Sequence, residues 1–154
     1  MVISMRPFDS LTGMQMLWAF ISIIGFSINT NLKGWKIIFT GIGGALAWGS
    51  YLVILYYSSS LLLSVFLATV LVYFYSEIVA RLFRIPVSVF VICAIIPLVP
   101  GSTLYYSMSA YIMGKTMQAS RLFGQTVLIS GTISMAIAVM SSISNLYKKV
   151  IRRF

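Results

Sequence analysis

The stretch AIIPLVPGSTLYY (residues 94–106) places two prolines and one glycine inside an otherwise mostly apolar segment. It lies within a run that contains no Asp, Glu, Lys or Arg and extends from residue 85 to residue 114. A run of this length exceeds the roughly 20 apolar residues that a membrane-spanning helix needs. The stretch therefore predicts a helix that is broken inside a membrane, not a loop between soluble elements.

The composition of the whole chain agrees with this interpretation. The chain has 154 residues, of which 60% are hydrophobic and 8% charged, and its mean hydropathy is +1.00. An ordinary soluble domain carries about a quarter charged residues. The eleven Lys and Arg residues leave three further uncharged runs, at 10–32, 37–76 and 122–147. The chain is predicted to be an integral membrane protein.

These runs predict an all-α protein with about five transmembrane helices in a single domain covering residues 1–154. The expected spans are 11–29, 37–57, 61–83, a broken 87–114 and 121–147, followed by a basic cytoplasmic tail at 148–154. Asp9 and Ser10 are candidates to cap the first span, which we expect to be uncleaved. Pro86 ends the third span, because the residue before a proline is disfavoured in helical conformation.

The basic residues lie at the ends of the apolar runs, where cytoplasmic loops collect them. Five crossings place eight of the eleven on one side of the membrane, so the N-terminus is predicted outside and the C-terminus inside. A re-entrant hairpin in the fourth segment, returning to its starting side, is the open alternative. The net charge of +9 is thus a membrane feature, and no nucleic-acid partner is expected.

The sparse polar chemistry argues against an enzyme. One Cys and no His exclude a disulfide framework, a His/Cys metal site and a His-based catalytic triad within this chain. The two carboxylates, Asp9 and Glu77, belong to different segments. We therefore expect no catalytic residue, no metal and no cofactor.

The two prolines of the fourth segment predict where its helix stops. Pro97 and Pro100 cannot donate to the carbonyls of Cys93 and Ile96, and their rings clash with the preceding turn. Both carbonyls are therefore expected to lose their helical partners. In hydrocarbon, unwound backbone survives only where protein or a water-filled cavity supplies hydrogen-bond partners.

A new half-helix is expected to begin at Gly101, with Ser102 or Thr103 as its cap. Its free N–H groups and the positive end of its dipole would attract a carboxylate, and two tyrosine hydroxyls follow within about one turn. A simple packing kink is the alternative. The predicted substrate-binding residues are Pro97, Pro100, Gly101, Ser102, Thr103, Tyr105 and Tyr106.

Glu77 is the only carboxylate in a predicted span, and Arg81 lies one turn after it in the favourable order. One interpretation is a pair that couples transport to protons or gates a pathway. The alternative is an ion pair that anchors the cytoplasmic end of the third span.

Two sets of small residues recur at about helical spacing. In TGIGGALAW (residues 40–48) they are Gly41, Gly43, Gly44 and Ala47, and in the fifth span they are Ser130, Ser134 and Ala138. Such surfaces let two helix backbones approach closely, so helix packing is predicted. A glycine-lined permeation path is the alternative. The polar Asn29 and Gln125 are expected to bond to neighbouring helices.

The segment YSEIVARLFRIPVSVFVICAIIPLVPGSTLYYSMSAYI (residues 75–112) resembles the threonine/serine exporter family of bacteria and fungi. The resemblance is to the second membrane half of that family, which often occurs as a small separate subunit. It is carried mainly by Glu77, Ala80-Arg81, Arg84, Pro86, Ile96-Pro97-Leu98-Val99-Pro100-Gly101, Tyr105-Tyr106 and Met108.

The resemblance implies a multi-pass subunit of a secondary exporter in the bacterial cytoplasmic membrane. Its expected partner is a larger subunit with a soluble region and about five spans, and its expected substrate is a small carboxylate, threonine or serine. Two halves with odd numbers of spans would be inverted relative to each other, as in many secondary transporters. A dicarboxylate substrate such as succinate, a non-transporting scaffold and a homo-oligomeric channel remain alternatives.

Overall fold

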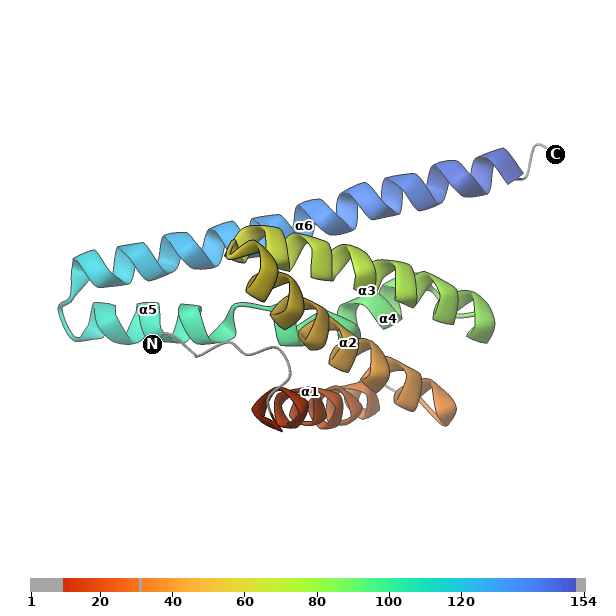
Figure 1. The fold of residues 1–154 in the computed structure, drawn as a ribbon, viewed down its shortest axis with the longest axis horizontal. Coiled ribbons are helices and arrows are strands. Elements are labelled where there is room, and N and C mark those ends of the chain that lie inside the picture. Colours follow the sequence, from red (N-terminus) through yellow and green to blue (C-terminus); the bar gives the residue numbers. More distant parts are fainter. Residues whose placement is uncertain (1–9, 31, 152–154) are drawn as a thin grey trace.

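The computed structural model describes residues 10–30 and 32–151 (Figure 1). Within these residues all regular secondary structure is helical, which confirms the predicted all-α class. The elements in chain order are α1 (Ser10–Asn29), α2 (Trp35–Ser58), α3 (Leu61–Phe83), α4 (Val87–Ala94), the 3-10 helix η1 (Ile96–Leu98), α5 (Gly101–Ile112) and α6 (Thr116–Ile151).

Four of these helices, α1, α2, α3 and α6, are long and apolar enough to cross a membrane. The pair formed by α4 and the segment Ile96–Ile112 passes the same test together, with a bend of 40° between its two parts. The described residues thus contain four spans, or five if the bent pair crosses once. The protein is a multi-pass membrane protein.

The central helix of the bundle is α3, which packs against α2, α4 and α6. Half of its membrane span is buried, compared with 17% for α1 at the periphery. In Figure 1, α2 crosses the bundle obliquely, with α1 on its far side from α3. The antiparallel pair of α5 and α6 extends at one end beyond the turn between α2 and α3. This arrangement puts the helix break beside the interior of the bundle.

The glycines of α2 lie where this helix meets its neighbours. A Cβ atom at Gly41 would lie 2.8 Å from the ring of Phe20 on α1. A Cβ atom at Gly43 would lie 3.1 Å from the ring of Tyr75 on α3 and 3.1 Å from the Cβ of Ala94 on α4. Gly44 faces Ile23 of α1 at similarly close range, and Ala47 is fully buried. Small residues here allow α2 to contact three helices at once.

A hydrogen bond reinforces the contact at Gly43. The Tyr75 hydroxyl on α3 donates to the carbonyl oxygen of Phe39 on α2 at 2.8 Å. Because the tyrosine ring lies against Gly43, a larger residue there would displace both the ring and its hydroxyl.

The small residues of α6 are in a different situation. Ser130, Ser134 and Ala138 are exposed, and a Cβ atom added at the adjacent Gly131 would meet nothing within 4 Å. The Ser134 hydroxyl donates to the carbonyl of Ser130, within its own helix. No described helix covers this stripe. Its role in helix packing stays a prediction, and the packing partner would have to be another molecule.

The boundaries differ from the predicted ones mainly at the last helix. It starts at Thr116 instead of residue 121 and continues through Lys148 and Lys149 to Ile151. Gly114, with φ of +74°, ends the preceding turn, and no helix-breaking residue follows it. Charged side chains near a membrane surface can reach the headgroups without ending the helix. Asp9 and the last three residues of the predicted tail lie outside the described residues.

Substitution of Gly43 by Leu is expected to destabilise the protein by about 1–3 kcal/mol, because overpacking forces neighbouring side chains and backbones apart. The matched control is Gly131→Leu, whose side chain would enter open space. Thermal unfolding of both variants in detergent checks this expectation. Equal melting temperatures for the two variants would contradict the close packing of α2.

Candidate functional site

The backbone between α4 and α5 gives the Ile96 carbonyl a hydrogen-bond partner that the sequence did not predict. The N–H of Leu98 donates to the carbonyl of Ile95 at 2.8 Å, and the N–H of Val99 donates to that of Ile96 at 3.1 Å. The expectation that Ile96 would have a free carbonyl is therefore wrong. A tighter 3-10 turn supplies donors that an α-helix interrupted by proline lacks.

The start of α5 also differs from the prediction. Pro100 is the N-cap residue, no side chain caps the helix, and Gly101 is the first helical residue. Ser102 and Thr103 therefore lie inside the first turn, and their assignment as the cap is wrong. The Thr103 hydroxyl donates to the Pro100 carbonyl at 3.0 Å. Ser102 and Thr103 lie among the first residues of the helix, whose N–H groups have no acceptor within it.

A cavity of about 180 Å³ opens beside this turn, and we call it the helix-break cavity. It lies among α2, α3, the 97–103 region and α6. The residues from the break that line it include Pro97, Pro100, Ser102 and Thr103, all of them predicted site residues. The first turn of α5 thus borders a space large enough for a small solute.

Three residues from other helices contribute polar groups to the helix-break cavity. The Trp48 indole N–H on α2 donates to the side-chain oxygen of Gln15 on α1 at 3.2 Å. The Tyr51 hydroxyl and the Gln125 side-chain amide have no hydrogen-bond partner among the described residues. The expected bond from Gln125 to a neighbouring helix is not found there, and its amide can instead serve a solute.

The other predicted substrate residues lie outside the helix-break cavity. Gly101 is exposed and does not line it, and a Cβ atom there would meet nothing within 4 Å. Tyr105 and Tyr106 are 68% and 61% exposed, and their rings pack edge to face with centroids 5.5 Å apart. The structure thus brings together four of the seven predicted residues and adds Trp48, Tyr51 and Gln125.

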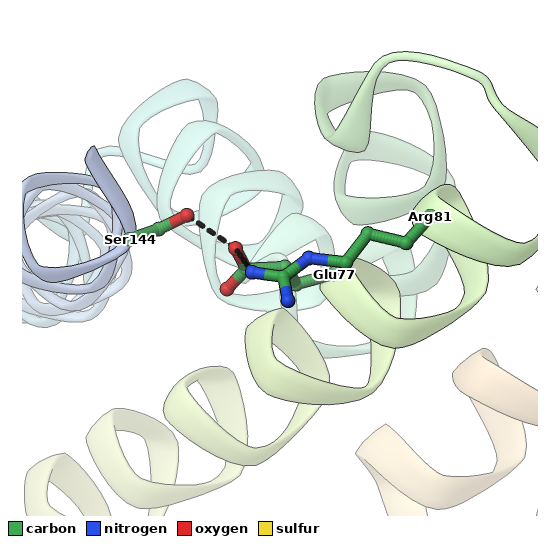
Figure 2. A network of polar contacts seen from close by, with 3 residues as sticks. All are labelled: Glu77, Arg81 and Ser144. Carbon is green, nitrogen blue, oxygen red and sulfur yellow. Dashed lines mark hydrogen bonds and ion pairs between the residues drawn. The ribbon is translucent and has the colours of Figure 1, made fainter. Parts of the chain in front are cut away.

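Figure 2 shows a polar network near the C-terminal end of α3, whereas the helix-break cavity lies near its N-terminal end. The Arg81 guanidinium donates to the Glu77 carboxylate at 2.7 Å, the pair expected from their spacing. Ser144 of α6 donates to the same carboxylate oxygen. The Glu77 side chain is 11% exposed and that of Arg81 is 54% exposed. The carboxylate therefore lies inside the contact between α3 and α6, and the guanidinium reaches outward.

A second cavity, of about 360 Å³, adjoins this network, and we call it the Glu77 cavity. Its polar side consists of Glu77, Arg81 and Ser144, and its apolar side consists of Phe74, Ile78, Met140 and Ile143. Val65, in the helix-break cavity, lies twelve residues before Glu77 on α3. At 1.5 Å per residue the two cavities are about 18 Å apart along this helix.

Ser144 was not predicted from the sequence, because nothing in its neighbourhood distinguishes it from the other serines of α6. Its partner lies 67 residues earlier in the chain. The coupling or gating role predicted for Glu77 and Arg81 stays a prediction.

The fold is that of a polytopic membrane protein, and two cavities lie between its helices. Secondary transporters belong to this class of protein. Comparison with known families assigns it further: the family model described as Threonine/Serine exporter, ThrE matches residues 15–143. The chain therefore belongs to the threonine/serine exporter family, as its sequence resemblance indicated. The same comparisons found no match among curated proteins or among solved structures.

Replacement of Ser144 by Ala is expected to destabilise the protein by about 1 kcal/mol, because a hydrogen bond to a buried carboxylate is lost. Ser142→Ala is the control, since that exposed hydroxyl bonds only to the Ala138 carbonyl in its own helix. Melting temperatures in detergent compare the two. A larger loss in the Ser142 variant would contradict the assigned role of Ser144.

Proposed function

We propose that the chain is a membrane subunit of a secondary exporter of small hydroxylated amino acids, threonine and serine. It would work with a larger homologous subunit in the bacterial cytoplasmic membrane. The family match supports the substrate class and the transport function. The single observation that carries the site is the helix-break cavity at the first turn of α5.

The groups around this cavity suit the backbone of an amino acid. The N–H groups of Ser102 and Thr103, at the positive end of the α5 dipole, would bind the substrate carboxylate. The Tyr51 hydroxyl and the Gln125 amide oxygen would accept hydrogen bonds from the ammonium and the side-chain hydroxyl. All four residues line the same cavity.

The size of the cavity suits a small solute, and its charge favours this substrate class over a dicarboxylate. Its volume of about 180 Å³ is below the roughly 300–1,000 Å³ of pockets that hold drug-sized ligands. No Lys or Arg is among the described residues that line it. A second carboxylate, as in succinate, would therefore enter without a cationic partner.

The packing of the helices suggests how the cavity could open alternately to the two sides. α4 packs on α2 and α3, whereas α5 packs on α6. The Thr126 hydroxyl of α6 donates to that of Thr103 on α5 at 2.9 Å, which ties these two helices together. The 95–100 turn connects these two groups of helices, which also pack against each other where α6 meets α3. We propose that the α5–α6 pair rocks about this turn, with Glu77 and Arg81 as the coupling or gating pair.

Ser102→Leu tests the site in cells that export threonine through this protein and its partner. Ser102 lines the helix-break cavity, so the larger side chain should fill part of the cavity at the first turn of α5 and remove most of the threonine efflux. Gly101→Leu is the matched control, because Gly101 is the preceding residue, does not line the cavity and has open space around it. Unchanged threonine and serine efflux in the Ser102 variant, at equal membrane abundance, would refute the site.

The predicted orientation gives a separate test. If the fourth segment crosses the membrane once, epitope tags at the two ends of the chain lie on opposite sides, with the C-terminal tag inside. Protease accessibility of each tag in intact and permeabilised cells measures this. Tags on the same side would instead indicate four crossings and a re-entrant hairpin formed by α4 and α5.

A further inference from the structure

The Glu77 cavity contains a combination of groups that the helix-break cavity lacks. A carboxylate and a guanidinium lie side by side, 2.7 Å apart, at one edge of an otherwise apolar space. We propose that this cavity is a second binding site for the ammonium and carboxylate groups of a free α-amino acid. This inference rests on the proposed function, since it concerns the same class of substrate.

The argument starts from the complementarity of charges. An α-amino acid carries an ammonium and a carboxylate on the same carbon atom, so its opposite charges are adjacent, as are those of Glu77 and Arg81. Laid antiparallel to the pair, the ammonium meets Glu77 and the carboxylate meets Arg81. A guanidinium has five N–H donors and a carboxylate about four acceptor positions. Both kinds of group can therefore hold several partners at once, and the ligand would join the partners that Glu77 and Arg81 already have.

The burial of the two side chains fits different tasks. Glu77 is fixed in the interior by Ser144 and has an 11% exposed side chain, whereas the Arg81 side chain is 54% exposed. A fixed anion suits an ammonium ion, and an outward-reaching guanidinium suits bidentate capture of a carboxylate. The zwitterion itself carries no net charge, so its binding adds no net charge beside the apolar walls.

The same arrangement discriminates between candidate substrates. A dicarboxylate would present a negative charge to Glu77, and unlike an ammonium it would be repelled. The apolar walls, which include Phe74 and Ile143, would accommodate the short side chain of a small amino acid. The cavity is therefore expected to bind threonine or serine and to reject succinate.

The location suggests what a second site does in the transport cycle. The Glu77 cavity lies about 18 Å along α3 from the helix-break cavity, by the rise of 1.5 Å per residue. It lies near the end of α3 that the positive-inside rule places in the cytoplasm. A site there would bind the amino acid before it reaches the helix break.

Equilibrium binding of radiolabelled L-threonine to the full-length chain tests the proposal. The chain is held in phosphatidylglycerol nanodiscs, whose lipid carries no ammonium group. Glu77→Gln and Arg81→Gln should each weaken a threonine site roughly tenfold or more, since each removes the protein charge that faces one charged group of the ligand. Arg84→Gln, an exposed arginine that lines neither cavity, should bind as the parent does. Unlabelled serine should compete at this site and succinate should not.

Two further variants keep the result interpretable if one substitution impairs folding. Arg81→Lys retains a positive charge and should keep part of the affinity that Arg81→Gln loses. Gln125→Leu alters only the helix-break cavity and should leave the Glu77 site intact. Threonine binding that is absent, or insensitive to both the Glu77 and Arg81 substitutions in folded protein, would overturn the proposal.

Phosphatidylethanolamine also carries an ammonium beside an anionic group, so the lipid is tested as an alternative source of this chemistry. Loss of the Arg81-dependent threonine site in phosphatidylethanolamine nanodiscs would assign the cavity to the lipid headgroup and overturn the proposal, whereas its retention there would support the amino acid. The proposed function is tested separately. Threonine efflux that depends on Ser102, while threonine binding is insensitive to the Glu77 and Arg81 substitutions, would leave the exporter function intact and reject only this second site.

Discussion

The rest of this structure depends on the requirement that backbone polar groups inside a membrane find hydrogen-bond partners within the protein. Two prolines interrupt the fourth hydrophobic segment, and the 3-10 bonds at Leu98 and Val99 replace part of what the α-helix loses. The N–H groups of the first turn of α5 have no acceptor within that helix. Ser102 and Thr103 of this turn line a cavity formed with α2, α3 and α6, so the prolines that interrupt the helix also place backbone N–H groups beside this cavity.

The sequence was sufficient to predict the helices, because uncharged runs bounded by Lys and Arg correspond to spans. It also predicted an interruption of the fourth segment, since Pro97 and Pro100 have no N–H to donate, and the structure has separate helices α4 and α5 there. Its errors were local. A free Ile96 carbonyl and a Ser102 or Thr103 cap both assumed that an α-helix simply stops at a proline, whereas the chain tightens into a 3-10 turn and restarts at Gly101. The early start of α6 was missed because a charged residue does not end a helix.

The candidate sites were predicted less completely, because many of their residues are far apart in the sequence. Glu77 and Arg81 could be paired because they are four residues apart on one helix. Trp48, Tyr51 and Gln125 meet the helix break only through the packing of separate helices, and Ser144 meets Glu77 across 67 residues. Hydrophobic periodicity fixes which residues form a helix and which face is apolar. It does not determine which polar residues of different helices will be neighbours.

The length of α6 has a mechanical consequence. Its 36 residues correspond to about 54 Å at 1.5 Å per residue, well beyond the roughly 30 Å of the hydrocarbon layer. In Figure 1 it runs from its turn with α5, past the other helices, to the opposite end of the molecule. One uninterrupted helix thus borders both the helix-break cavity, through Gln125, and the Glu77 cavity, through Ser144. Because a single helix lines both cavities, a rigid tilt of α6 would change the shape of both at the same time.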